Sequence, residues 1–234
     1  MPYQNFVPLR IFSAYTMLEG AIEPKAISKQ ARKLGFPAAA LTDRNGLYAA
    51  MAFSDAAKKD GVQPVIGTLL AIKRPGIDQH IVDWLALYAQ DARGYDNLCA
   101  LVSAAHLERP VHEEAHVPLS TLEGRTDGLI ALTAASEGAL TRLLAGEQRD
   151  AADAYADRLE ALFPCRLYIE LARRGDATEE AAEEALIELA YARDLPLVAT
   201  NPACYAEPEF HAAHDAMLCI ASSSYIDTAE RPRA

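Results

Sequence analysis

Residues 37–72 read PAAALTDRNGLYAAMAFSDAAKKDGVQPVIGTLLAI and contain one complete strand–helix–strand unit. The apolar run 37–42 predicts a buried strand that ends in a polar turn at 43–46. The spacing of apolar residues predicts a helix over 47–59, which Gly61 ends, and the apolar run 63–72 predicts the next strand. Because such connections return to a parallel neighbour by a right-handed crossover, this stretch predicts an α/β fold.

The same alternation continues on both sides of this unit. Further strands are expected at 6–12, 83–89, 128–133, 166–171 and 195–200. Further helices are expected at 24–34, 92–106, 137–145, 150–162, 178–193 and 207–220, with Thr178 as an N-cap. Seven or eight such units in about 220 residues favour a distorted, TIM-like (β/α)7 barrel, with parallel strands inside and helices outside.

The charge of the chain limits its partners. Its 234 residues include 22 Lys and Arg and 33 Asp and Glu, for a net charge of −11, and 51% of them are hydrophobic. This composition is typical of a globular protein and excludes a disordered chain. An excess of negative charge repels phosphate backbones, so we expect no non-specific nucleic-acid binding by this chain alone.

Cysteine spacing and the absence of targeting signals favour a cytoplasmic protein. The four cysteines lie far apart and form no C-x-x-C pair, which argues against a zinc ribbon or a disulfide framework. The N-terminus has no signal-peptide pattern, and no run of about 18 apolar residues predicts a membrane span.

The expected strand ends offer few metal ligands, although barrel enzymes carry their chemistry there. Arginine stays protonated, and phenylalanine, leucine and proline side chains have no donor atom. His211 and His214 share a helix face without a third ligand in register. The side chains at or near strand ends that could bind a metal are Glu19, Asp43, Glu170 and Cys204. This set is too small and too mixed for a multi-metal phosphoesterase cluster, so we expect no metal or other cofactor in this chain.

Several motifs, in order and spacing, resemble one family. They are FVPLRIFSAYTMLEGAI at 6–22, LTDRNGL at 41–47, AAKKDGVQPVIG at 56–67, GYDNLCALVS at 94–103, GLIAL at 128–132 and HDAMLCI at 214–220. The chain resembles the PHP (polymerase and histidinol phosphatase) domain of bacterial DNA polymerase III alpha subunits, in their replicative form. The resemblance implies a barrel of seven parallel strands within a far longer DNA-directed DNA polymerase. Residues 1–222 are then the PHP barrel, and 223–234 begin the connection to the polymerase core.

The resemblance also implies where metal-binding members of the family hold their ligands. Their motifs H-x-H, T-D-H, G-C-E and N-D-x-H, with a thiol at the fifth strand, supply the donors. The aligned positions here are Arg10, Phe12, Arg44, Leu69, Ala135, Pro202 and Cys204. Glu19 alone keeps a ligand type among the positions that can be aligned. Because the loss of even one ligand usually empties such a site, the resemblance implies neither a metal nor a catalytic residue here.

Two functions follow from different classes. The first is a catalytically inactive structural domain that supports DNA synthesis, with a proofreading exonuclease subunit and the rest of the polymerase as its partners. In this interpretation DNA binds through regions absent from this chain and not through this domain, and no membrane is involved. An overlapping interpretation is a pure interaction module whose acidic helix 178–193 or basic loop at Arg173 and Arg174 docks a partner. The alternative is a metal-dependent phosphoesterase or 3′–5′ exonuclease with the ligand set Glu19, Asp43, Glu170 and Cys204.

Two arginines at former ligand positions carry one further expectation. If Arg10 and Arg44 both enter the old metal cleft, two guanidinium groups make an anion site for sulfate or phosphate. An empty cleft, or neutralisation of both arginines by Glu19 and Asp43, counts against such a site.

Overall fold

The computed structural model describes residues 5–74, 81–228 and 231. Contacts divide the chain into two compact units. Unit 1 contains Met1–Arg44, Tyr48–Ile66 and Pro202–Ala234, and unit 2 contains Asn45–Leu47 and Gly67–Asn201. Each unit has its own hydrophobic core. The expected boundary after residue 222 stays a prediction.

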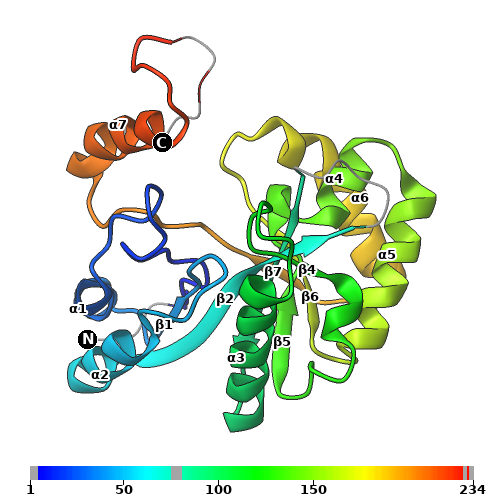
Figure 1. The fold of residues 1–234 in the computed structure, drawn as a ribbon, viewed down its shortest axis with the longest axis horizontal. Coiled ribbons are helices and arrows are strands. Elements are labelled where there is room, and N and C mark those ends of the chain that lie inside the picture. Colours follow the sequence, from blue (N-terminus) through cyan, green and yellow to red (C-terminus); the bar gives the residue numbers. More distant parts are fainter. Residues whose placement is uncertain (1–4, 75–80, 229–230, 232–234) are drawn as a thin grey trace. The chain divides into compact units, whose positions relative to one another are not determined.

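Unit 1 is built around two helices and a short parallel strand pair (Figure 1). Its elements are α1 (Pro24–Leu34), β1 (Ala38–Leu41), α2 (Ala50–Asp60), the start of β2 (Gln63–Lys73), the 3-10 helix η3 (Pro208–Phe210) and α7 (His211–Ala221). Proline at its first position and left-handed Gly35 after its last turn give α1 the predicted bounds. Ile27 and Ala31 of α1 share the core with Phe53 and Ala57 of α2.

Two expectations within unit 1 are wrong in detail. The segment 6–12 is no regular strand: the described residues give it one isolated bridge, Ile11 to Ala203. It still bonds on two sides, because Ala40 N donates to Pro8 O at 2.9 Å and Ala203 N donates to Arg10 O at 2.8 Å. Proline 8 has no N–H for a ladder, which explains part of this irregularity. Helix α2 begins at Ala50 rather than at residue 47.

Unit 2 contains a mixed sheet. Its strands are the second part of β2, β3 (Asp83–Ala89), β4 (Val117–Pro118), β5 (Leu129–Leu132), β6 (Leu167–Leu171) and β7 (Leu197–Ala199). Strand β3 is antiparallel to both β2 and β5, whereas the pairs β2–β4, β5–β6 and β6–β7 are parallel. The expectation of parallel strands throughout is therefore wrong for β3. The connection 74–82 is too short for the crossover that a parallel return from β2 needs.

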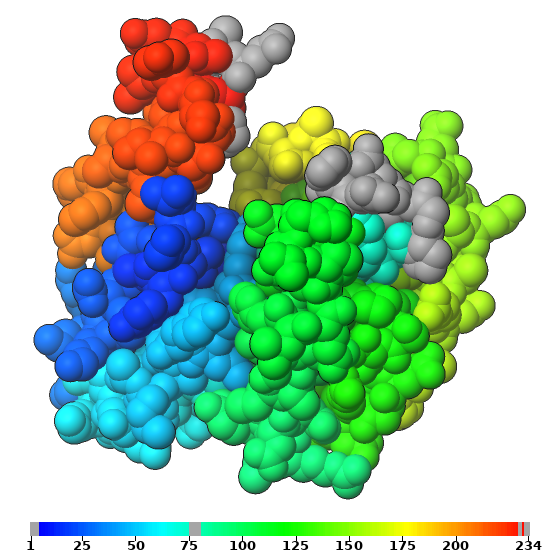
Figure 2. Space-filling model, viewed as in Figure 1, coloured from blue at the N-terminus to red at the C-terminus, as the bar shows by residue number. Residues whose placement is uncertain are grey.

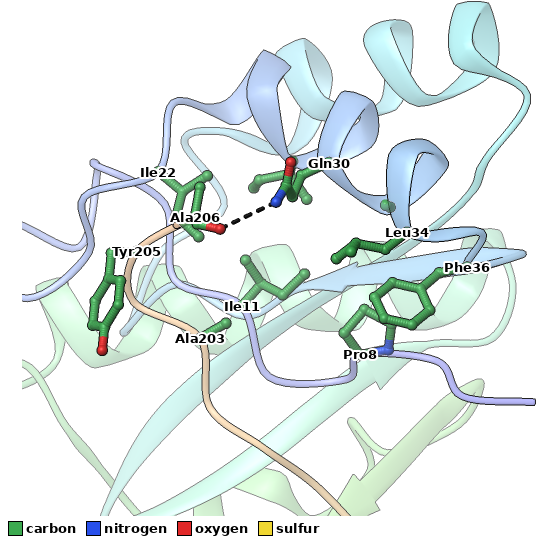
Figure 3. A pocket seen from close by; sticks show the side chains of 11 residues that line it. Pro8, Ile11, Ile22, Gln30, Leu34, Phe36, Ala203, Tyr205 and Ala206 are labelled. Atoms are coloured by element: carbon green, nitrogen blue, oxygen red, sulfur yellow. Dashed lines mark hydrogen bonds between the residues drawn. The ribbon is translucent and has the colours of Figure 1, made fainter. Parts of the chain in front are cut away.

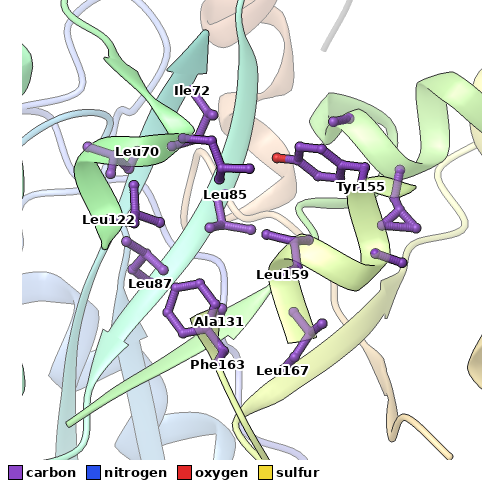
Figure 4. Packing of buried hydrophobic residues seen from close by; sticks show 14 of the residues in the cluster. Leu70, Ile72, Leu85, Leu87, Leu122, Ala131, Tyr155, Leu159, Phe163 and Leu167 are labelled. Atoms are coloured by element: carbon purple, nitrogen blue, oxygen red, sulfur yellow. The ribbon is translucent and has the colours of Figure 1, made fainter. Parts of the chain in front are cut away.

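The helices of unit 2 cover this sheet (Figure 1). They are α3 (Ala92–Leu107), α4 (Ala139–Ala145), α5 (Arg149–Leu162) and α6 (Ala177–Ala192), with the 3-10 helices η1 (Leu119–Leu122) and η2 (Ala135–Glu137). Tyr155 and Leu159 of α5, with Phe163 just beyond it, pack toward the β2 and β3 leucines in Figure 4. The N-cap of α6 is Asp176, which accepts from Thr178 N at 2.8 Å, so the expected Thr178 cap is wrong.

Helices and parallel strand pairs occur in both units, which confirms the α/β class. Within the part of the chain that the structure describes, every helix is too short or too polar to span a bilayer.

Candidate functional site

Two arginine side chains flank one aromatic ring at the start of unit 1. Arg10 is fully buried and Phe12 is 1% exposed. The guanidinium carbons of Arg10 and Arg44 lie 5.7 and 5.1 Å from the centroid of the Phe12 ring. Both distances are within cation–π range. The structure thus brings together three positions that the resemblance aligns with metal-binding histidines.

Glu19, which keeps a ligand type, is bound to Arg44. Arg44 Nη2 donates to Glu19 Oε1 at 2.7 Å and Nε donates to Oε2 at 2.5 Å, which makes a bidentate pair. The two side chains are 22% and 26% exposed. This pair offsets the charge of Arg44, which is one part of the condition that counts against an anion site, namely neutralisation of both arginines. The anion site at Arg10 and Arg44 itself stays a prediction.

Asp43 fixes the loop 13–16, which follows the irregular segment 6–12. Its Oδ1 accepts from Ser13 N at 2.7 Å and Thr16 Oγ1 at 2.8 Å, while Oδ2 accepts from Ser13 Oγ at 2.7 Å. Asp43 is 1% exposed. Three hydrogen bonds to this buried carboxylate explain an aspartate at the end of β1 without any metal.

The loop that carries Glu19 is also held from its other side. A Cβ at Gly20 would lie 2.0 Å from Ser13 O, so no larger residue fits this close approach. His214 Nε2 lies 2.7 Å from Glu19 O, and Ala21 N donates to Cys204 O at 2.7 Å. Helix α7 and the segment around Cys204 therefore position Glu19.

A buried carboxylate joins the strand ends of unit 2. Glu170 is 0% exposed, and it accepts from Ala134 N at 2.9 Å and from Thr200 Oγ1 at 2.5 Å. Its own N donates to Thr133 Oγ1 at 2.9 Å. Ala134 and Ala135 have φ of 63° and 45°, a conformation that costs energy for residues other than glycine. Glu170 thus stabilises the turn that contains Ala135, and Leu69, another former ligand position, is buried as well.

A second buried carboxylate lies in α6, although glutamates on a helix usually face solvent. Glu179 is 5% exposed and accepts from Ser136 Oγ at 3.0 Å and from Arg174 Nη2 at 2.7 Å. Arg173 forms a bidentate pair with Glu183. The expected basic loop therefore consists of two arginines that already have carboxylate partners. In the sequence, only the proximity of Arg173 and Arg174 to these glutamates indicated such pairing.

The available donors do not fit a metal centre. Glu19, Asp43 and Cys204 belong to unit 1, whereas Glu170 belongs to unit 2. Across residues 5–74, 81–228 and 231, no three His, Cys, Asp or Glu side chains gather as a metal site. Glu19, Asp43 and Glu170 are each engaged in hydrogen bonds within the protein. That the chain binds no metal stays a prediction.

Unit 1 also has an apolar pocket of about 120 Å³, shown in Figure 3. Ile11, Ile22 and Leu34 line it, and Gln30 Nε2 closes one side by donating to Ala206 O at 3.1 Å. Tyr205 also lines the pocket, but no second acidic or basic side chain lies beside it in the lining, so the pocket contains no acid–base pair.

The family model for the PHP domain matches residues 8–174. A DNA polymerase III subunit alpha from Caulobacter vibrioides is 41% identical over 236 residues, which cover 98% of this chain and 20% of the relative. The Pseudomonas aeruginosa subunit is 30% identical over 98% of this chain and 19% of its own length. An error-prone DNA polymerase from Symbiobacterium thermophilum is 34% identical over 97% of this chain and 22% of its own length.

Solved structures support the fold. A protein from Bifidobacterium adolescentis described as a metal-dependent phosphoesterase matches with a TM-score of 0.54 and 15% identity, over 89% of this chain and 91% of that one. An amidohydrolase from Chromobacterium violaceum, with bound sulfate and no metal, matches with a TM-score of 0.54 and 12% identity, over 90% and 96% of the two chains. At these identities the matches establish the fold alone.

The chain spans about a fifth of the length of the curated relatives it matches. The family model covers most of the chain, and the matched relatives agree with the resemblance that the motifs indicated. The chain therefore belongs to the PHP domain family.

Proposed function

We propose that the chain is the PHP domain of a replicative DNA polymerase III alpha subunit and is itself catalytically inactive. It acts as a structural and docking domain that supports DNA-directed DNA synthesis in the cytoplasm. Identity of 41% to a subunit of that name, over nearly the whole chain, supports the parent activity. The error-prone relative, at 34%, falls between the two alpha subunits at 41% and 30%, so identity alone does not separate the two forms, and the replicative form rests on the opening motif at 6–22 and the AAKK motif at 56–59.

One observation carries the proposed inactivity: guanidinium groups stand where the family motifs place metal ligands. Arg10 is fully buried beside Phe12, and Arg44 lies against the same ring while it holds Glu19. A permanently charged guanidinium repels a divalent cation and cannot coordinate it. The metal-bound hydroxide of a phosphoesterase therefore lacks a binding site in unit 1.

The experiment is a hydrolysis assay with the 234-residue chain in Mn²⁺, Zn²⁺ or Mg²⁺. A generic phosphomonoester and a 3′-labelled DNA strand serve as substrates. The proposal expects rates equal to those in buffer for each metal. Metal-stimulated turnover of either substrate contradicts it.

The partners we propose are the rest of the polymerase and its proofreading exonuclease subunit. The principal DNA-binding surface lies in regions outside this chain. Binding of the chain to the exonuclease subunit, measured by calorimetry, tests the docking role. Binding only by a polypeptide that extends past Ala234 would place the docking surface elsewhere.

The alternative is a metal-dependent phosphoesterase, which the fold shared with a protein of that description favours. It requires Glu19, Asp43, Glu170 and Cys204 to bind metal, although the three carboxylates already accept hydrogen bonds within the protein. Under this alternative Glu170→Gln removes a metal-stimulated activity, which the same assay detects.

A further inference from the structure

The negative charge of the chain is not evenly distributed. Unit 1 has ten Lys and Arg against ten Asp and Glu, whereas unit 2 has 12 against 23. The whole net charge of −11 therefore belongs to unit 2, and unit 1 is neutral by this count. The expectation that this chain repels phosphate backbones was based on the net charge of the whole chain, which does not separate the two units.

Helix α1 has a stripe of cations on its solvent face. Lys25, Lys29 and Arg32 have the spacing i, i+4, i+7 and are all exposed. The first turn of α1 contains no acidic residue that could offset Lys25, and the helix dipole disfavours cations at this end. Like charges at this spacing cost a helix about 0.2–0.5 kcal/mol per pair. Helix stability therefore does not explain why Lys25 and Lys29 occur on this face of α1.

Helix α2 extends this positive surface. Its last turn carries Lys58 and Lys59, both exposed. These lysines and Arg32 line one groove of about 600 Å³, where the ends of α1 and α2 meet. Asp60 also borders the groove, but it accepts a hydrogen bond from Ser28 Oγ at 2.6 Å. Figure 2 shows α2 in cyan beside the blue N-terminal part of the same unit.

These five cations differ from exposed arginines of unit 2 in their pairing. Among the described residues, no carboxylate forms an ion pair with Lys25, Lys29, Arg32, Lys58 or Lys59. In unit 2, Arg93 pairs with Asp127 at 2.6 Å, Arg149 with Glu188 at 3.2 Å and Arg173 with Glu183 at 2.8 Å. The positive surface of α1 and α2 is thus available to an anion from outside the chain.

We propose that the α1–α2 basic surface, formed by Lys25, Lys29, Arg32, Lys58 and Lys59, binds the phosphate backbone of DNA. The choice of DNA as the anion rests on the proposed function, because a polymerase subunit works beside DNA. Flexible lysines that lack internal partners suit sequence-independent phosphate contacts. This surface provides a secondary contact with DNA, in addition to the principal DNA-binding surface in other parts of the polymerase.

The test is fluorescence anisotropy of a short labelled single strand with the 234-residue chain at several salt concentrations. The variant K25E/K29E/K58E removes three cations from the surface. Because each phosphate contact contributes about −0.7 to the salt slope of a single strand, we expect the slope to weaken by about 2 and the low-salt affinity to fall at least about tenfold. The milder K25Q/K29Q/K58Q should show the same direction with a smaller loss.

The matched control is R93E/R149E/R173E, which changes the total charge by the same amount within unit 2. We expect its affinity to stay within about twofold of the unchanged chain. Equal losses in both variants, or no binding by the unchanged chain, overturn the proposal. Tighter binding of polyglutamate than of DNA also overturns it and identifies an acidic protein as the partner.

Primer extension by the longer polymerase separates this inference from the proposed function. If extension occurs and the chain binds no DNA strand, the proposal that the α1–α2 basic surface binds DNA is wrong and the proposed function stands. If the longer protein does not extend primers, the proposed function fails whatever the chain binds.

Discussion

The two units differ in the charged side chains that they bury near their strand ends, because unit 1 buries a guanidinium as well as the Asp43 carboxylate, whereas unit 2 buries carboxylates. Unit 1 buries Arg10 and places it with Arg44 against the Phe12 ring. Unit 2 buries Glu170 and Glu179, which accept hydrogen bonds from neighbouring turns. The difference indicates that unit 1 keeps positive charge where the family motifs place a cation, but supplies it covalently. Under the proposed function, a protein cation fixed in this way stabilises the loops and takes the place of a coordination site.

The largest effect is expected for Arg10→Ala. It removes a fully buried side chain and its contact with the Phe12 ring, so it leaves a cavity, and we expect the free energy of unfolding to fall by about 4 kcal/mol. Urea unfolding followed by circular dichroism measures this. Arg32→Ala, an exposed cation of the same unit, is the control and should change stability by less than about 0.5 kcal/mol. Equal effects would show that burial of Arg10 contributes nothing.

Glu170→Ala should have the next largest effect, in unit 2. It leaves Ala134 N and Thr200 Oγ1 without their acceptor, and we expect a loss of about 3 kcal/mol, since each buried unsatisfied group costs about 1–3 kcal/mol. Thermal and urea unfolding give the value. Glu170→Gln retains one carbonyl acceptor and should lose less. A larger loss in the glutamine variant would contradict the hydrogen-bond account.

Arg44→Ala should cost less than either change, because the Arg44–Glu19 pair is partly exposed. We expect about 1 kcal/mol, from the lost bidentate pair and the lost contact with Phe12. A double-mutant cycle with Glu19→Gln isolates the part due to the pair. No coupling between the two changes would mean that the pair does not hold the Glu19 loop.

The smallest effect is expected at the surface of unit 2. The hydrogen bond from Arg173 lowers the pKa of Glu183 below its ordinary value of 4.5. A carboxyl with a depressed pKa stabilises the fold above its unfolded pKa and loses this contribution as the pH falls through its folded pKa. Arg173→Ala should therefore return the pKa of Glu183 towards 4.5, with little change in stability at neutral pH. NMR titration of the Glu183 carboxyl measures it, and an unchanged pKa would exclude Arg173 as the cause.

The sequence predicted most clearly the elements with strong local signals. Helix α1 has the expected bounds because Pro24 begins it and Gly35 ends it. The direction of β3 could not be predicted by counting strand–helix units, since an apolar run has the same pattern in either direction. Strand β4 (Val117–Pro118) was not predicted, because a strand of two residues has no periodicity to detect.

The candidate site was predicted in part. The motif comparison identified Arg10, Phe12 and Arg44, and the structure brings them together around one ring. Pairing of the arginines with Glu19 and Asp43 was only one of the outcomes that the sequence left open, because Arg44 and Glu19 are 25 positions apart and the fold of the loop decides their distance. The burial of Glu179 was also missed, since glutamate repeats on a helix usually face solvent and only the tertiary position of Arg174 changes that.

Metal stoichiometry tests the central claim, that fixed guanidinium groups have replaced a metal site, most directly. The chain is incubated with Mn²⁺ or Zn²⁺, dialysed and analysed by emission spectrometry, with R10H/F12H/R44H as a variant that restores three imidazoles. The account predicts far less than one metal ion per unchanged chain and an increase in the variant. One tightly bound metal ion per unchanged chain would contradict it.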